Sequence, residues 1–96
     1  MTHSQLTYSH IIGTFSQNRE NVMIKHQIGL RIREIRQSKK MTQEMCALSI
    51  DMDRTYWASV ELGKRNISIV NIKKICDCFG MSLKAFFDSN IFENKK

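Results

Sequence analysis

The chain has 96 residues, which is enough for one small domain, or one domain with a tail, and allows only a modest buried core. Its 15 Lys and Arg residues against 9 Asp and Glu give a net charge of +6 and a pI near 9.5, a balance that suits an anionic partner such as nucleic acid. The absence of proline and the presence of only four glycines argue against a turn-rich β protein and favour helices.

The first 22 residues carry the weakest structural signal. An apolar stripe on a short helix would consist of Leu6, Ile11, Ile12 and Phe15. Gly13 weakens such a helix, and the alternative is a frayed or loosely packed extension. In either case we expect two parts, an N-terminal extension over residues 1–22 and a folded domain over residues 23–96.

The pattern of residues 24–40 is that of an amphipathic helix. Its apolar face consists of Ile28, Ile32 and Ile35. Arg31 and Arg33 lie elsewhere on this helix, and we expect them to be solvated rather than bound to nucleic acid. Arg36 falls beside the apolar face, where it can reach an acidic residue across the fold, and Glu61 is the candidate.

Residues 43–61 predict two short helices joined by a tight turn, which is the spacing of a helix-turn-helix. Thr42 and Asp53 each stand one position ahead of a helix, where a side-chain oxygen can accept from an unpaired backbone N–H. Ala47 is small where the two helix axes must approach closely. The apolar positions that we expect to press the two helices together are Met45, Cys46, Ile50, Met52, Trp57 and Val60.

The outward face of the second of these helices carries the functional groups. If Trp57 faces the core, Arg54 and Thr55 face outward, and Ala58 and Ser59 follow one turn later. A guanidinium, a hydroxyl and a methyl group are what base edges in a DNA major groove can be read with. We therefore interpret the start of this helix as a base-reading surface.

A polar link follows, in which Gly63 can end the preceding helix in a left-handed conformation. Ser68 then caps a helix over residues 69–79, Gly80 ends that helix, and Ser82 caps a last one. The apolar residues that repeat along the 69–79 helix are Ile69, Ile72, Ile75, Cys76 and Phe79.

The last helix carries two adjacent phenylalanines. Neighbouring residues on a helix point about 100° apart, so Phe86 and Phe87 cannot both be fully buried in one small core. We expect at least one of them to face a second copy of the chain as part of an exposed apolar patch. The alternative is that the tail folds back over them. The residues expected at the homodimer interface are Leu83, Phe86, Phe87, Ile91 and Phe92.

Cysteine and histidine spacing gives no framework for a disulfide network or a metal. Cys76 and Cys78 lie two apart on an expected helix, so their side chains diverge. No C-x-x-C pair occurs, and the three histidines are scattered. We expect reduced thiols that act as small apolar residues, no metal, no other cofactor and no small-molecule ligand. Since no apolar run approaches the roughly 20 residues of a membrane span, we also expect a cytoplasmic protein.

With five helices laid out, residues 24–88 resemble the DNA-binding domain of Cro and the phage repressors. The resemblance rests on the segments IGLRIREIR, MTQEMCA and VELG, with the turn between the last two. Within that family, DRTYWASVELGKRN, with FF after the last cap, is most similar to the controller proteins of restriction–modification systems. The resemblance implies an all-α, five-helix, lambda repressor-like fold. It also implies a regulator that binds a pseudo-palindromic double-stranded DNA operator as a homodimer and acts on its own gene and the endonuclease gene.

The resemblance also implies residue roles. Arg54 and Thr55 match base-reading positions, Ser59 matches a third one turn on, and Arg65 matches a loop arginine that touches DNA. We expect Tyr56 to donate its hydroxyl to a phosphate or to pack on a thymine methyl group. Arg54 is the strongest of them, because a bidentate contact to guanine typically gives about 1–3 kcal/mol of discrimination. The residues expected to contact DNA phosphates are Thr42, Gln43, Lys64 and Asn66. Arg36 and Glu61 match a partly buried structural ion pair.

Four residues depart from the family pattern. Lys40 and Asp51 stand where glycine is usual, at positions that favour a positive φ. Trp57 is larger than the usual residue and Cys46 is smaller, and we expect the two to compensate in volume.

Three other functions are alternatives to the controller. An antitoxin or phage-type repressor would share the DNA-binding core and use residues 1–22 to grip a protein partner. A module that binds no nucleic acid would fail to bind any duplex. An enzyme is not expected, because the sequence offers no nucleophile with a nearby base, no plausible carboxylate pair and no phosphate-binding glycine loop.

Overall fold

The computed structural model describes residues 22–93, and all regular structure in that range is helical. A first helix runs through residues 22–38. It is followed by α2 (Gln43–Ser49), α3 (Arg54–Glu61), α4 (Ile69–Phe79), α5 (Leu83–Phe87) and the short 3-10 helix η1 (Asn90–Phe92). The predicted all-α, five-helix fold is therefore confirmed. The proposed stripe of Leu6, Ile11, Ile12 and Phe15 lies outside the described residues. Across residues 22–93, no helix has the length and apolarity to span a membrane.

The first helix, predicted over residues 24–40, instead runs through residues 22–38, and Lys40 beyond its end has a positive φ. The helices α2 to α5 begin at the predicted residues because the capping groups are in place. A side-chain oxygen ahead of each of these four helices accepts a backbone N–H from its first turn, and the residues that supply it are Thr42, Asp53, Ser68 and Ser82. Gly80 ends α4 at φ 67°, and Gly63 follows α3 at φ 75°. Lys40 and Asp51 adopt φ values of 56° and 53°, so the two departures from glycine carry the expected left-handed backbone.

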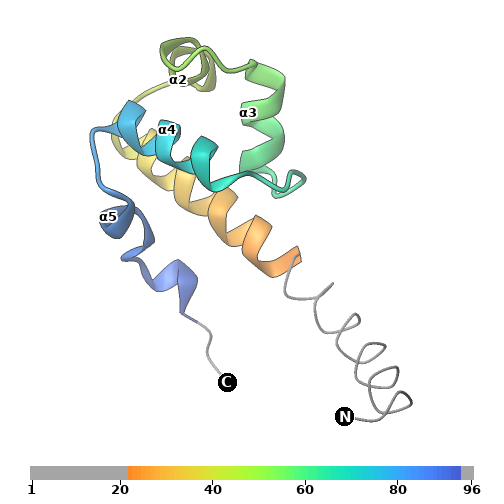
Figure 1. Cartoon of the computed structure of the whole chain (residues 1–96), viewed down its shortest axis with the longest axis vertical. Helices are drawn as coiled ribbons and strands as arrows, with labels where there is room; N and C mark the ends of the chain where they lie inside the picture. The colour runs from red at the N-terminus through yellow and green to blue at the C-terminus, as the bar shows by residue number, and fades with distance from the viewer. Residues whose placement is uncertain (1–21, 94–96) are drawn as a thin grey trace.

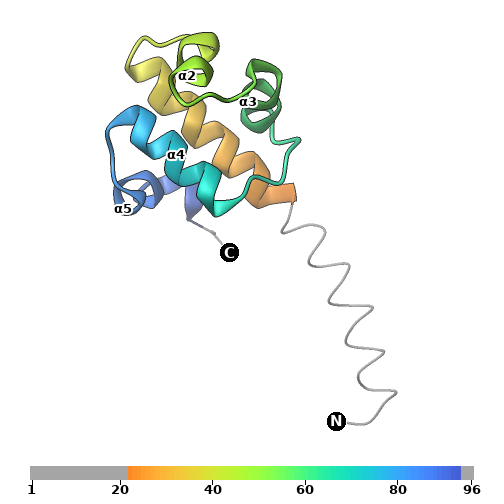
Figure 2. The same ribbon diagram turned by 45° about the horizontal axis from the view of Figure 1, so that its top comes forward.

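The first helix forms the spine of the domain. It lies against α4 in both views, with α2 and α3 on one side of it and α5 on the other (Figures 1 and 2). The first helix and α2–α5 all contribute to one core, whose residues are Ile28, Ile32, Ile35, Cys46, Ala47, Trp57, Val60, Ile72, Ile75, Cys76, Phe79 and Phe86.

Two residues assigned to the core are exposed. Met45 is 52% exposed, because Cys46 and Ala47 together form the buried face of α2 and Met45 points away from the middle of that face. Ile69 is 60% exposed, since it stands in the first turn of α4, at the edge of the stripe formed by Ile72 and Ile75.

Close contacts hold the first helix against the end of α3 and the end of α5. A β carbon on Gly29 would lie 2.5 Å from the carbonyl oxygens of Val60 and Glu61, so only glycine lets the end of α3 approach this closely. Arg31, expected to be solvated, instead donates from Nε to the carbonyl of Phe86 at 2.7 Å and from Nη2 to that of Ala85 at 2.9 Å. These two bonds satisfy carbonyls at the C-terminal end of α5, which has no next helical turn to do so.

Candidate nucleic-acid interface

The interface is built on an indole buried beneath α3. Trp57 is 1% exposed and packs edge-to-face on Phe79, with ring centroids 6.0 Å apart. Its Nε1 donates to Glu61 Oε2 at 2.6 Å, one helical turn on. Because the indole is fixed inside at both its ring and its N–H, the rotation of α3 about its own axis is fixed as well.

The buried carboxylate of Glu61 accepts hydrogen bonds from three side chains, those of Arg36, Gln43 and Trp57. We call these four residues the Glu61 network. Arg36 donates from Nε to Oε2 at 2.6 Å and from Nη2 to Oε1 at 3.0 Å, the expected ion pair in bidentate form. Gln43 Nε2 donates to Oε1 at 3.1 Å. Burial opposes ionisation of Glu61, but the hydrogen bonds from Arg36, Trp57 and Gln43 outweigh it and hold its pKa below the usual value. The network thus joins the first helix, α2 and α3.

The sequence predicted only half of this network. It assigned Gln43 to a DNA phosphate, whereas the amide of Gln43 is already bound to Glu61 in the structure. It also missed the bond between Trp57 and Glu61. The spacing of four residues between these two was a usable signal, because residues i and i+4 on a helix share a face.

The anchored helix presents the predicted reading groups to solvent. Arg54 and Thr55 are exposed in the first turn of α3, which faces outward in Figure 2. Ser59 is half-buried and donates from Oγ to the carbonyl of Thr55 at 2.9 Å, so its proton is engaged within the helix. Asp53 caps the same turn by accepting from the N–H groups of Thr55 and Tyr56.

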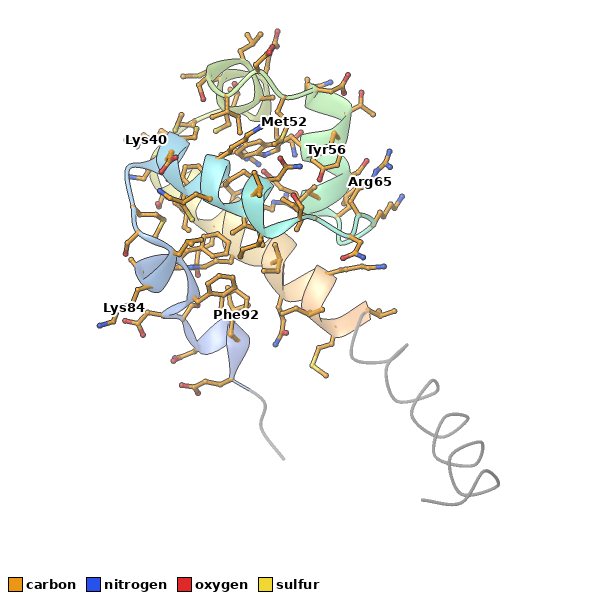
Figure 3. The ribbon with its side chains drawn as sticks, in the orientation of Figure 1. Lys40, Met52, Tyr56, Arg65, Lys84 and Phe92 are labelled. Carbon is orange, nitrogen blue, oxygen red and sulfur yellow. The ribbon has the colours of Figure 1, made fainter. Side chains whose placement is uncertain are left out.

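A second cluster joins α3 to the link and to α4. Asn71 Nδ2 donates to Tyr56 Oη at 3.3 Å, and the Arg65 guanidinium lies over the Tyr56 ring, 5.8 Å from its centroid. Figure 3 shows Tyr56 and Arg65 side by side at the right of the domain. We call these three residues the Tyr56 cluster. The exposed Lys64 and Asn66 flank Arg65 in the link. Asn71 was not predicted, because nothing in the spacing connects it to a tyrosine fifteen positions earlier.

An open depression of about 360 Å³ separates the starts of α2 and α3. Its lining brings together three predicted contact residues, Thr42, Gln43 and Arg54. The remaining lining residues are Arg36, Met41 and Glu44. Thr42 Oγ1 is engaged as the cap of α2, accepting from Met45 N at 3.1 Å. The depression therefore places an exposed guanidinium beside the beginning of a helix, an arrangement suited to a phosphate group.

The predicted dimer interface needs correction. Phe86 is fully buried in the monomer and offers no surface to a partner, while Phe87 is 38% exposed. The tail does fold back, because Gln27 Nε2 donates to the carbonyl of Ile91 at 2.7 Å and the Phe92 ring packs on that of Phe86. Leu83, Ile91 and Phe92 are half-buried as a result.

Phe87 borders a second set of exposed apolar residues. A groove of about 190 Å³ is lined by Ile24, Lys25, Ile28, Asn66, Ile67, Ile72 and Phe87. Ile69 and Val70, at the start of α4, are exposed to 60% and 61% and stand in the chain between two of the lining residues. We call the exposed residues Ile24, Ile69, Val70 and Phe87, together with this groove, the apolar face. Sequence analysis missed Val70 and placed Ile69 in the core.

Comparisons with known proteins agree with this geometry. Residues 29–90 match the model of a helix-turn-helix domain family. The chain is 43% identical over 65 residues to the control protein C.MunI of Mycoplasma sp., a match that covers 67% of this chain and 88% of the relative. In structure it is similar to the restriction–modification controller protein C.AhdI of Aeromonas hydrophila, with a TM-score of 0.63 and 36% identity over 66% of this chain and 96% of the other. It is also similar to the controller protein C.Esp1396I, which was crystallised as a tetramer in complex with its natural 35 base-pair operator. The TM-score is 0.64 and the identity is 33%, and the match covers 67% of this chain and 84% of the other.

Proposed function

Because this chain belongs to the helix-turn-helix domain family, and within it to the restriction–modification controller proteins, we propose that it is a sequence-specific DNA-binding regulator of transcription. It is not an enzyme, and it acts in the cytoplasm, where its operator lies. The observation that carries the proposal is the exposure of Arg54 and Thr55 at the start of a helix whose buried side is locked by Trp57 and Glu61. Such a helix enters a major groove with its reading groups already oriented.

Each predicted contact residue has a place in this function. Arg54 reads a guanine, and Thr55, Tyr56, Ser59 and Arg65 contact the neighbouring bases. The phosphate contacts come from Thr42, Gln43, Lys64 and Asn66. Since the side chain of Gln43 is held by Glu61, its contribution comes from its backbone N–H. The positive charge of the chain adds to affinity, which therefore falls steeply with salt concentration.

Two copies bind together. A pair of these domains places two recognition helices in successive major grooves about 34 Å apart, so the operator is pseudo-palindromic. The two copies contact each other through the apolar face. Phe87 is the residue of the predicted interface that also belongs to this face. Residues 22–93 supply both the DNA and the dimer contacts.

The regulated genes follow from the relatives. A controller acts on its own promoter and on that of the adjoining endonuclease. It activates at low occupancy and represses when a second dimer loads. C.Esp1396I has been crystallised as a tetramer on a 35 base-pair operator, an assembly of the size that such a second dimer requires.

Footprinting of the DNA upstream of the chain's own gene tests the proposal. We expect a protected, pseudo-palindromic site, and Arg54→Ala weakens binding to it by about 1–3 kcal/mol. Lys84→Ala is the matched control, because it also removes one positive charge but lies on the opposite side of the domain from Arg65 (Figure 3). An absence of protection, or equal losses in the two variants, contradicts the proposal. A methyltransferase gene and an endonuclease gene beside this one distinguish a controller from a phage-type repressor or an antitoxin.

A further inference from the structure

Two cysteines from different helices meet at the contact between α2 and α4. Cys78 Sγ lies 3.9 Å from the carbonyl oxygen of Cys46, although the two residues are 32 positions apart in the chain. Ser49 Oγ bridges them, donating to that same carbonyl at 2.7 Å and lying 3.1 Å from Cys78 Sγ. The thiol of α4 is therefore held directly against the turn of α2 that carries Cys46.

The two thiols influence each other but differ in access. Cys46 is completely buried, and its burial, with the neighbouring Cys78 thiol as the next cause, raises the pKa of Cys46 to about 12. Cys78 is only half-buried and reaches solvent at the edge of the contact. Cys76 is also buried, and burial raises its pKa, but it diverges from Cys78 around α4. One accessible thiol thus stands beside one sheltered thiol, and the third is set apart.

We propose that Cys46 and Cys78 are a modification site that peroxides oxidise to a reversible disulfide joining α2 to α4. The accessible Cys78 reacts first: its sulfur attacks one peroxide oxygen, the O–O bond breaks, and water leaves as the sulfur becomes a sulfenic acid. Cys46 then attacks that sulfur, the S–O bond breaks, and a second water carries off the proton of Cys46. The two thiols supply the two electrons that reduce the peroxide, and a dithiol reductant reverses the reaction.

Formation of this disulfide does not depend on DNA binding. We expect the disulfide to be transient. A reducing compartment keeps such thiols reduced until an oxidant is present, so the bridge forms only under oxidative load. The bond closes a loop that contains α3 and the link of residues 62–68. Restricting that loop in the unfolded chain makes the oxidised protein harder to unfold than the reduced one.

Mass spectrometry of the full chain tests the proposal. The protein is treated with hydrogen peroxide, its remaining thiols are blocked with N-ethylmaleimide in denaturant so that buried thiols also react, and it is digested without reductant. We expect the loss of two hydrogen atoms per chain, one labelled thiol at Cys76, and a single linked pair of peptides that contains Cys46 and Cys78. Dithiothreitol restores three labelled thiols.

Single substitutions supply the controls. Cys76→Ser retains the bridge, whereas Cys46→Ala and Cys78→Ser lose it, and Cys46→Ala accumulates sulfenic or sulfinic acid at Cys78 instead. Circular dichroism shows whether each variant is folded. If Cys46→Ala or Cys78→Ser is unfolded, the wild type and Cys76→Ser are sufficient for the test. Peroxide also raises the thermal midpoint of both bridged proteins. Three labelled thiols after peroxide, a bridge that involves Cys76, or a link only between two chains overturns the proposal.

Discussion

The Glu61 network and the Tyr56 cluster both position groups around α3, but they hold them in different ways. The network is buried and charge-assisted, with hydrogen bonds of 2.6–3.1 Å that converge on one carboxylate. The cluster lies at the surface and depends on one neutral bond of 3.3 Å and a guanidinium 5.8 Å from a ring centroid. The rotation of α3 is therefore fixed by contacts inside the protein, whereas Arg65, a proposed DNA contact, is held more loosely.

The largest expected effect comes from breaking the network. Glu61→Ala leaves the Arg36 charge, the Trp57 N–H and the Gln43 amide without their acceptor, and removal of one partner from a buried ion pair costs about 3–5 kcal/mol. Urea unfolding of the two proteins measures this loss of stability. Asp77→Ala is the control, because it breaks the exposed pair between Lys73 and Asp77 and should change the unfolding midpoint little. Similar losses in both variants would falsify the distinction between buried and exposed pairs.

The second largest effect comes from separating the first helix from α3. Gly29→Ala places a methyl group 2.5 Å from the carbonyl oxygens of Val60 and Glu61, so the first helix must move away from α3. Overpacking of this kind costs about 1–3 kcal/mol. Thermal unfolding measures the loss, and a variant as stable as the parent contradicts the close approach. Gly80→Ala is an informative comparison, since its β carbon meets no atom within 4 Å and any cost there comes from the left-handed backbone alone.

Acid weakens the Glu61 network by protonating the Glu61 carboxylate. The folded-state pKa of Glu61 is lowered, so the carboxylate stabilises the fold above its unfolded pKa of about 4.3, and that contribution is lost as pH falls through the folded value. Wild type and Glu61→Gln are compared by urea unfolding from neutral pH down to the acid transition. We expect the advantage of the wild type to shrink below about pH 4.3. A difference that stays constant with pH would show that Glu61 contributes no charge-dependent stability.

The smallest effect comes from the Tyr56 cluster. Asn71→Ala removes the bond to the Tyr56 hydroxyl, and such a neutral hydrogen bond contributes about 0.5–1.5 kcal/mol. Because Tyr56 and Arg65 are proposed DNA contacts, we expect the loss to appear as weaker operator binding, while stability changes less. Tyr56→Phe removes the same bond from the other side, so the double variant should bind no more weakly than the weaker single variant. Additive losses show that Asn71 does not act through Tyr56.

Part of the site was predictable because its signals are local. Thr42 and Asp53 were identified as caps from their place before a periodic run, and Trp57 was placed inside from the periodicity of α3. The outward direction of Arg54 and Thr55 followed from that placement, since residues on a helix are separated by a fixed rotation. The distant pair of Arg36 and Glu61 was also predicted, because Arg36 lies beside the apolar face of the first helix. Two other distant partners were missed: the carbonyls that Arg31 binds at the end of α5 and the tyrosine that Asn71 binds.

The sequence by itself determined the order, caps and inner faces of the helices, because hydrogen bonds and side-chain rotation within a helix depend on residues no more than four positions away. Only the tertiary structure decided which half-buried residues meet. It buried Phe86 beneath the returning tail, left Ile69 and Val70 at the surface, and brought Cys78 against Cys46. These outcomes depend on the angles at which the helices cross, and those angles follow from packing the whole core at once.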